Sequence, residues 1–186
     1  MRKLRVFNQV SLDGYFVDAR GDMSWAHKND PEWNEFVAGN ASGGGELLFG
    51  RVTYEMMASY WATAMAAKSD PVVAARMNSM PKVVFSRTLD AASWQNTRLV
   101  KDDIAAEVRR MKSASGGDIA ILGSGSIVAQ LASAGLIDEY QIVVNPIVLG
   151  SGRTLFEGIR KNLNLKLTGS RAFSNGNVVL GYEPAG

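Results

Sequence analysis

The chain has 186 residues, of which 46% are hydrophobic and 20% are charged, so it can form one folded domain and is not a disordered protein. The 20 Lys and Arg residues nearly balance the 18 Asp and Glu residues, and no long basic run occurs, so we expect no nucleic-acid partner. The absence of cysteine and the single histidine, His27, exclude disulfides, cysteine nucleophiles, thiolate zinc sites and multi-histidine metal sites.

The first half of the chain is predicted to alternate strands and helices. Residues 3–10 form a strand, and a loop over 11–25 follows, with Asp-Gly and Gly-Asp pairs. In Asp30-Pro31-Glu32, the aspartate caps a helix, the proline opens it and the glutamate interacts with the positive end of the helix dipole. This helix should end near Gly39. The next predicted elements are a strand at 46–49, a helix at 51–61, and a helix that begins at Asp70-Pro71.

The second half continues the alternation and ends in a hairpin. Strands are predicted at 82–86, 97–100 and 118–123, helices from Asp102 to about Lys112 and over 127–135, a strand and loop over 139–152, and hairpin strands at 163–173 and 177–183. Asn175-Gly176 is a typical hairpin turn. Residues 1–186 are therefore predicted to form a single α/β domain with three layers, α/β/α, in which a mostly parallel central sheet ends in an antiparallel C-terminal hairpin.

No stretch of the chain approaches the roughly 18 apolar residues that a membrane span requires. The apolar residues after Met1 alternate with charged ones, which is not typical of a signal peptide. We therefore expect a cytoplasmic protein with no membrane partner.

Two glycine-containing turns lead from a strand into a helix, at 47–53 and 120–127. Helix N-termini at the carboxyl edge of a parallel sheet bind phosphates, so these turns favour a phosphate-bearing cofactor. The Rossmann fingerprint would require glycine where Val128 stands, and Arg51-Val52 replaces the Lys-Ser/Thr pair of a P-loop. A nucleoside triphosphatase is therefore not expected.

Five motifs occur in an order that is typical of one superfamily. They are SLDG at 11–14, FGRVTYE at 49–55, VVFSRTL at 83–89, ILGSGSIVAQL at 121–131 and LIDEYQIVVNPIVLGSG at 136–152. Over almost its whole length the chain resembles the dihydrofolate reductase superfamily. It is most similar to the reductase domain of the bifunctional riboflavin-biosynthesis deaminase-reductase and to small stand-alone bacterial relatives of that domain. The resemblance implies a dihydrofolate-reductase-like fold and an NADPH-dependent oxidoreductase.

The resemblance also implies residues that bind NADPH. Gly50, Arg51 and Thr53 match a helix N-terminus that contacts cofactor phosphates, and Ser86-Arg87 matches the stretch around the adenosine 2′-phosphate, which suits a guanidinium. The glycine-rich turn around the pyrophosphate is matched by Gly123, Ser124, Gly125, Ser126 and Ile127. Dihydrofolate reductases have a Gly-Gly pair with a cis bond in this turn, and here Ser124 replaces the second glycine.

On the substrate side, Glu32 matches a carboxylate that holds the pterin, with Asp30 just before it. The simpler interpretation is that Asp30 caps the helix and Glu32 interacts with its dipole. Trp25 matches a tryptophan that lines the site, although it could also pack under the loop. Asp13 could lie at the mouth of the site or serve the geometry of an Asp-Gly turn.

Two departures separate the chain from riboflavin-pathway reductases. Ile121 stands where these enzymes carry a glutamate, and the helix that begins at Pro31 lacks their arginines for the ribosyl phosphate. Both departures argue against a ribosylaminopyrimidine substrate. A 5-amino-6-(5-phosphoribosylamino)uracil reductase therefore remains an alternative only.

The favoured hypothesis is hydride transfer from NADPH to a small, flat, pterin-like or aminopyrimidine-like heterocycle, without a metal. Glu32 is the first candidate for the proton donor and Asp13 the second. A dinucleotide-binding protein with little turnover is the second hypothesis, and a non-catalytic interaction domain is the third. A homodimer is expected, with residues 143–152 supplying a sheet-edge or loop contact.

Overall fold

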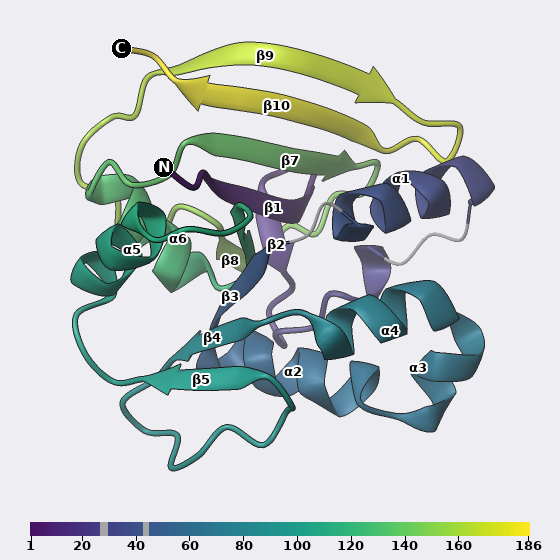
Figure 1. Ribbon diagram of the computed structural model, residues 1–186. Coiled ribbons are helices and arrows are strands. Elements are labelled where there is room, and N and C mark those ends of the chain that lie inside the picture. The colour runs from purple at the N-terminus through teal and green to yellow at the C-terminus, as the bar shows by residue number, and fades with distance from the viewer. Residues whose placement is uncertain (27–29, 43–44) are drawn as a thin grey trace.

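The computed structural model describes residues 1–26, 30–42 and 45–186, so His27 lies outside the described residues. An eight-stranded sheet in the order β5-β4-β3-β6-β1-β7-β10-β9 forms the centre of the molecule (Figure 1). Its strands are β1 (Leu4–Ser11), β3 (Glu46–Gly50), β4 (Lys82–Phe85), β5 (Thr97–Val100), β6 (Ile119–Leu122), β7 (Glu139–Asn145), β9 (Leu165–Ala172) and β10 (Val178–Pro184).

The strands from β5 to β7 are all parallel, whereas β10 runs antiparallel to β7 and β9 antiparallel to β10. The predicted mostly parallel sheet with an antiparallel C-terminal hairpin is therefore confirmed. Parallel neighbours need long crossover connections, and most of these connections contain helices. The hairpin instead turns at Asn175-Gly176, where Gly176 has a φ of 87° and donates its N–H to the Phe173 carbonyl.

Helices cover both faces of the sheet. They are α1 (Pro31–Ser42), α2 (Arg51–Trp61), α3 (Ala64–Ser69), α4 (Pro71–Ser79), α5 (Ile104–Ser113) and α6 (Gly125–Ser133). Successive residues of β3 point to opposite faces: Leu47 packs with residues of α2 and α4, and Leu48 with residues of α5 and α6. On the same face as α2 and α4, Trp33 of α1 packs against Val143 of β7. These contacts confirm the predicted three layers.

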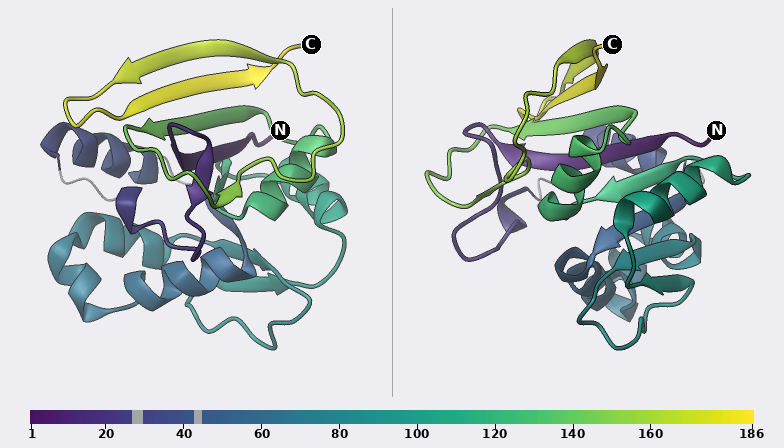
Figure 2. Two further views of the ribbon diagram at one scale, coloured as in Figure 1. Left: turned by 180° about the vertical axis from the view of Figure 1, so that it is seen from behind. Right: turned by 90° about the vertical axis from the view of Figure 1, so that its left-hand side faces the viewer.

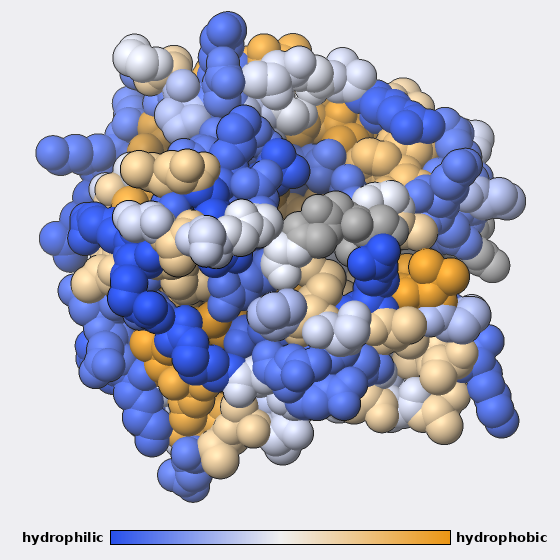
Figure 3. Space-filling model, viewed as in Figure 1, coloured by the Kyte–Doolittle hydropathy of each residue, from blue (hydrophilic) through white to orange (hydrophobic). Residues whose placement is uncertain are grey.

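Helices α1 and α4 lie over different parts of the sheet. Figure 2 shows the β9–β10 hairpin at one end of the molecule and α2 to α4 at the other end, with α1 close to the hairpin. Figure 3 shows hydrophobic surface between α1 and α4.

In the described part of the chain, no helix is both long and apolar enough to cross a bilayer.

Several boundaries differ from those predicted. Helix α1 extends beyond Gly39 to Ser42, and Asp103 rather than Asp102 caps α5, with its Oδ1 accepting the Ala106 N–H at 2.9 Å. Helix α3 was not predicted, because six residues are too few for a recognisable helical period. The pair of short strands β2 (Tyr15–Val17) and β8 (Arg153–Thr154) was not predicted either, since neither run shows a strand pattern without its partner.

Of the two contacts predicted for self-association, the sheet-edge contact is wrong. Strand β7 pairs with β1 on one side and with β10 on the other, so residues 143–145 cannot supply a free sheet edge. The loop that follows β7 stays a predicted contact for a second copy. The free edges of the large sheet belong to β5 and β9.

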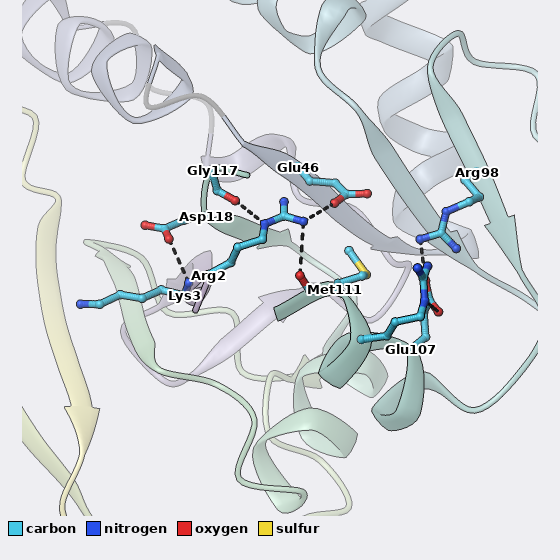
Figure 4. Close-up of polar contacts among 9 residues, drawn as sticks. Arg2, Lys3, Glu46, Arg98, Glu107, Met111, Gly117 and Asp118 are labelled. Carbon is cyan, nitrogen blue, oxygen red and sulfur yellow. Dashed lines mark hydrogen bonds and ion pairs between the residues drawn. The ribbon is translucent and has the colours of Figure 1, made fainter. Parts of the chain in front are cut away.

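The amino-terminal ends of the strands are held together by side chains. Figure 4 shows Arg2 reaching the carbonyl groups of Gly117 and Met111 and the Glu46 carboxylate, which lies 3.0 Å away. The Lys3 backbone N–H donates to the Asp118 carboxylate at 2.9 Å. These bonds join β1, β3 and the segment before β6 at the amino edge, opposite the edge where the helix N-termini meet.

Candidate functional site

A cleft of about 1310 Å³ extends along the face of the sheet that α1, α2 and α4 partly cover, and it reaches the carboxyl ends of β3 and β6. Its walls include Trp33 and Asn34 of α1, Met56 and Tyr60 of α2, and Phe7 of β1. The cleft is larger than the pocket of a typical single small ligand. The predicted cofactor residues that line it are Gly50, Arg51, Thr53, Ser86, Gly123, Ser124, Gly125, Ser126 and Ile127.

The first helix N-terminus in the cleft is that of α2. Strand β3 ends at Gly50, and α2 begins with the next residue, Arg51, so the strand leads directly into the helix. Gly50 is in the N-cap position with φ −84° and ψ 166°, and it has no side chain that could bond to the first N–H groups of the helix. These N–H groups therefore remain available to an anion.

The second helix N-terminus is that of α6, which follows the turn after β6. Gly123 and Ser124 both have left-handed backbone conformations, with φ angles of 65° and 62°. The peptide bond between them is trans, so this chain differs here from the cis Gly-Gly pair of dihydrofolate reductases. The Ser124 side chain makes no capping hydrogen bond to α6. The Ile127 N–H donates to the Ser124 carbonyl at 2.9 Å, so among the described residues it is the N–H groups of Gly125 and Ser126 that lack a partner.

Buried hydrogen bonds connect the two turns. The Ser124 hydroxyl accepts the Gly50 N–H at 2.6 Å, and the Thr53 hydroxyl accepts the Ser124 N–H at 3.0 Å. From β1, the Asn8 Oδ1 accepts the Gly123 N–H at 2.7 Å. The ends of β1, β3 and β6 are thereby fixed relative to one another, and the two helix N-termini lie side by side.

The glycines of these turns sit where a side chain would collide. A Cβ atom at Gly123 would lie 2.8 Å from the Thr53 Cγ2, and one at Gly125 would lie 2.9 Å from the Phe16 Cε1. A Cβ atom at Gly50 would lie 3.0 Å from the Ser124 hydroxyl oxygen. Glycine is therefore needed at Gly123 and Gly125 for the turns to approach one another closely, whereas a side chain at Gly50 would require Ser124 to move by a few tenths of an ångström.

Asn8 is a site residue that the sequence analysis missed. Its side chain is only 5% exposed and lines the cleft, and its Nδ2 is buried without a hydrogen-bond partner in the described part of the chain. Since the Gly123 N–H can only donate, the atom it meets must be Oδ1, which leaves Nδ2 as an unused donor. The signal was a polar residue among Leu4, Val6 and Val10, the buried positions on the same face of β1.

Ser86 and Arg87 follow the carboxyl end of β4, as predicted. The Ser86 hydroxyl accepts the N–H groups of Thr88 and Leu89 at 3.2 and 2.9 Å, and Ser86 lines the cleft. The Arg87 side chain is exposed and lies outside the lining of the cleft. A second hollow of about 470 Å³ is lined by Arg51 together with Thr88 and Leu89, which places Arg51 between the cleft and this loop.

The predicted substrate-binding residues Glu32 and Trp25 lie outside the lining of the cleft. The Glu32 carboxylate forms an ion pair with Arg171 of β9 at 2.8 Å, its side chain is 46% exposed, and the cleft lining does not include it. Trp25 donates its Nε1–H to the Asp22 carbonyl at 3.1 Å and also lies outside that lining. The tryptophan that lines the cleft is Trp33, which is buried.

Asp30 acts as the helix cap that the simpler interpretation predicted. Its Oδ1 accepts the Trp33 N–H at 2.8 Å, and its Oδ2 accepts the Ser174 hydroxyl at 2.8 Å. The Trp33 N–H and the Ser174 hydroxyl lower the pKa of the Asp30 carboxyl group below its usual value. The start of α1 is therefore bonded to the turn of the C-terminal hairpin.

Asp13 connects two loops. Its carboxylate accepts the Ser11 hydroxyl at 2.6 Å and the N–H groups of Leu149 and Gly150 at 3.1 and 2.7 Å. The bond from Ser11, followed by those from Gly150 and Leu149, lowers the pKa of Asp13 to about 2. The carboxyl group is thus ionised at neutral pH and holds the loop after β7 against the turn after β1.

Comparisons with known proteins agree with the fold. The model of the RibD C-terminal domain family matches residues 2–179. The chain is 29% identical to the uncharacterised protein YyaP of Bacillus subtilis over 94% of this chain and 90% of YyaP. A candidate riboflavin biosynthesis protein from Shewanella sp. PV-4 superposes with a TM-score of 0.77 at 23% identity, covering 99% of both chains. A diaminohydroxyphosphoribosylaminopyrimidine deaminase/5-amino-6-(5-phosphoribosylamino)uracil reductase from Thermotoga maritima superposes with a TM-score of 0.72 at 15% identity, over 99% of this chain and 57% of that one.

Proposed function

Since the chain belongs to the RibD C-terminal domain family, we propose that it is an NADPH-dependent reductase that transfers a hydride to a small, flat heterocycle. The observation that carries this proposal is the pair of helix N-termini, those of α2 and α6, that lie side by side in one cleft. Uncapped helix N-termini favour phosphate groups, and a dinucleotide carries several of them.

The residues of the cleft fit such a cofactor. Gly123 and Gly125 let the turns pack closely against Thr53 and Phe16, and Asn8 offers a buried donor beside the second turn. When bound, NADPH supplies the hydride, and the protein binds and orients the reactants and excludes water. The volume of about 1310 Å³ supports a cleft shared by a cofactor and a second molecule.

The preference for NADPH over NADH rests on Arg51, Ser86 and Arg87. A guanidinium can donate two hydrogen bonds to the adenosine 2′-phosphate, which NADH lacks. Arg51 lies beside the loop that contains Thr88, close to the position that the resemblance implies. Arg87 is exposed on the same loop, so its guanidinium is accessible to a bound 2′-phosphate.

The substrate side of the cleft favours an uncharged heterocycle. On the sheet face, Arg5 is already paired with Asp118 at 3.0 Å and with Glu139 at 2.6 Å, so its charge is compensated. The side chains of Gln9 and Gln141 project from the same face of the sheet, and their Oε1 atoms accept hydrogen bonds from Asn145 at 3.3 Å and from Asn40 at 2.9 Å. Their NH₂ groups can donate to the polar edge of a pterin-like or aminopyrimidine-like ring.

The proton-donor roles of Glu32 and Asp13 stay predictions, and the contacts of both residues favour positioning roles. Glu32 is paired with Arg171, and Asp13 is ionised and bonded to two loops. A donor must reach the substrate within hydrogen-bond distance or through one water molecule. Water that enters the cleft is therefore the alternative source of the proton.

Titration of the purified protein with NADPH and with NADH tests the cofactor proposal. We expect tighter binding of NADPH, and a loss of that preference in Arg87→Ala. If neither nucleotide binds, the reductase proposal fails. NADPH oxidation in the presence of dihydrofolate, or of 5-amino-6-ribosylaminouracil with and without its phosphate, then tests the substrate class. Tight NADPH binding without turnover of any acceptor would favour the dinucleotide-binding alternative.

We also propose a homodimer. The edge strand β9 is exposed along most of its length, and its unpaired backbone groups could bond to a second copy. Sedimentation should show a species of twice 20.1 kDa, and a single 20.1 kDa species at micromolar concentration would refute the dimer.

A further inference from the structure

The short strands β2 and β8 cover the glycine-rich turn. They pair with each other through Tyr15 and Thr154 and through Val17 and Arg153. Phe16 of β2 is buried, and its ring lies so close to Gly125 that a Cβ atom there would meet it at 2.9 Å. The same Cβ atom would lie 3.4 Å from the carbonyl oxygen of Leu155, just after β8. The pair of strands is therefore packed against the N-terminus of α6.

Arg153 brings a charge to this place, and no carboxylate among the described residues compensates it. Three arginines line the cleft, and two of them have carboxylate partners: Arg5 pairs with Asp118 and Glu139, and Arg51 pairs with Glu55 at 3.1 Å. Within the described ranges, Arg153 forms no ion pair. Its guanidinium carbon lies 5.7 Å from the centre of the Phe16 ring.

We propose that Arg153 binds a phosphate group of a ligand at the N-terminus of α6. This inference rests on the proposed function, and it adds a residue that the motifs do not assign. The exposed guanidinium of Arg153 lies near the Phe16 ring, and that ring packs on Gly125 at the start of α6. A guanidinium at this place matches the bidentate hydrogen bonding and the charge of a phosphate.

Asn8, which is bonded to the same turn, also favours a polar ligand group. The unpartnered Nδ2 of Asn8 is buried, and the Oδ1 of the same side chain binds Gly123, two residues before Gly125. A buried donor without a partner costs free energy, which a ligand oxygen can recover. One ligand could therefore bond to Asn8 on the inner side of the turn while its phosphate bonds to Arg153 at the rim.

The phosphate can come from two sources. The pyrophosphate of NADPH is one, and the sugar phosphate of a phosphorylated substrate is the other. Both present the same oxyanion to Arg153, so the experiment uses NADPH, inorganic pyrophosphate and ribose 5-phosphate as separate probes in titration calorimetry.

The variants are Arg153→Ala and Arg153→Lys, with Arg160→Ala as the matched control. Arg160 is an exposed arginine in the loop after β8 and does not line the cleft. We expect Arg153→Ala to weaken phosphate binding by about tenfold to a hundredfold, and Arg153→Lys to weaken it less because the charge remains. Arg160→Ala should stay within about twofold of the wild type. If thermal unfolding shows that the alanine variant does not fold, the lysine variant carries the test.

Each outcome decides the proposal. Weaker binding of NADPH and pyrophosphate by the Arg153 variants supports a cofactor phosphate, whereas weaker binding of ribose 5-phosphate to the NADPH-loaded protein supports a substrate phosphate. If every probe binds the Arg153 variants as tightly as it binds Arg160→Ala, the role of Arg153 is refuted while the reductase proposal stands. If the wild type does not bind NADPH, the reductase proposal fails, and pyrophosphate and ribose 5-phosphate alone decide the role of Arg153. Failure of all three probes to bind the wild type refutes both.

Discussion

Substitutions of Ser124 can separate two opposing effects in the glycine-rich turn. Ser124 is 8% exposed and has a left-handed backbone with φ 62° and ψ 68°, which is unfavourable for any residue with a Cβ atom. Its hydroxyl nevertheless accepts the buried Gly50 N–H at 2.6 Å. Ser124→Gly removes both the strain and the acceptor, whereas Ser124→Ala removes only the acceptor.

The magnitudes predict which effect dominates. A buried N–H that loses its acceptor costs about 1–3 kcal/mol, so Ser124→Ala should lower the free energy of unfolding by that amount. Relief of the left-handed strain recovers roughly 1 kcal/mol, so Ser124→Gly should be less destabilised than Ser124→Ala by about 1 kcal/mol. Because the hydrogen bond is the larger effect, we expect both variants to be less stable than the wild type.

Equilibrium unfolding in urea, followed by tryptophan fluorescence, measures these differences. Each kcal/mol should also shift the melting temperature by about 2–4 °C for a chain of this size. Ser126→Ala is the matched control because Ser126 is exposed in the same turn, and its stability should change by less than about 0.5 kcal/mol. If Ser124→Gly is more stable than the wild type, or Ser124→Ala equally stable, the hydrogen bond to Gly50 does not have the predicted strength.

Three further predictions concern other parts of the molecule. Burial lowers the pKa of Lys82 to about 8 from its usual 10.5, so between these pH values the unfolded chain binds the proton more strongly and this group makes stability rise with pH. In Lys82→Met, the free energy of unfolding in urea should lose this rise between pH 8 and pH 10. If the variant and the wild type show parallel pH profiles of stability, the prediction is contradicted. Gly123→Ala should destabilise the protein by about 1–3 kcal/mol and weaken NADPH binding, because its Cβ atom would lie 2.8 Å from Thr53 and its φ is 65°; unchanged melting and affinity would speak against the close packing. Glu32→Gln should leave NADPH oxidation with a confirmed substrate within about twofold, since the carboxylate is paired with Arg171 outside the cleft, and a large loss of turnover would restore its proposed catalytic role.

Local patterns in the sequence were sufficient for most of the fold. The strand at 97–100 and the helix at 51–61 occur with the predicted bounds, and Asp70 caps α4 with Pro71 as its first residue. The glycine-containing turns at Gly50 and Gly123 lie together in one cleft, as the parallel sheet required. These features depend on side-chain periodicity, capping and glycine conformation, which act over a few neighbouring residues.

The roles of individual site residues depend instead on contacts between distant segments. Glu32 matched a substrate carboxylate by its position on α1, but the C-terminal hairpin brings Arg171 within 2.8 Å of it. The unused donor of Asn8 becomes apparent only when Gly123, 115 residues away, is seen to occupy the acceptor of the same amide. Arg153 lies 5.7 Å from the centre of the Phe16 ring because β8 pairs with β2, two strands too short to be recognised in isolation. Such pairings follow from the packing of the whole chain, so spacing along the sequence could not reveal them.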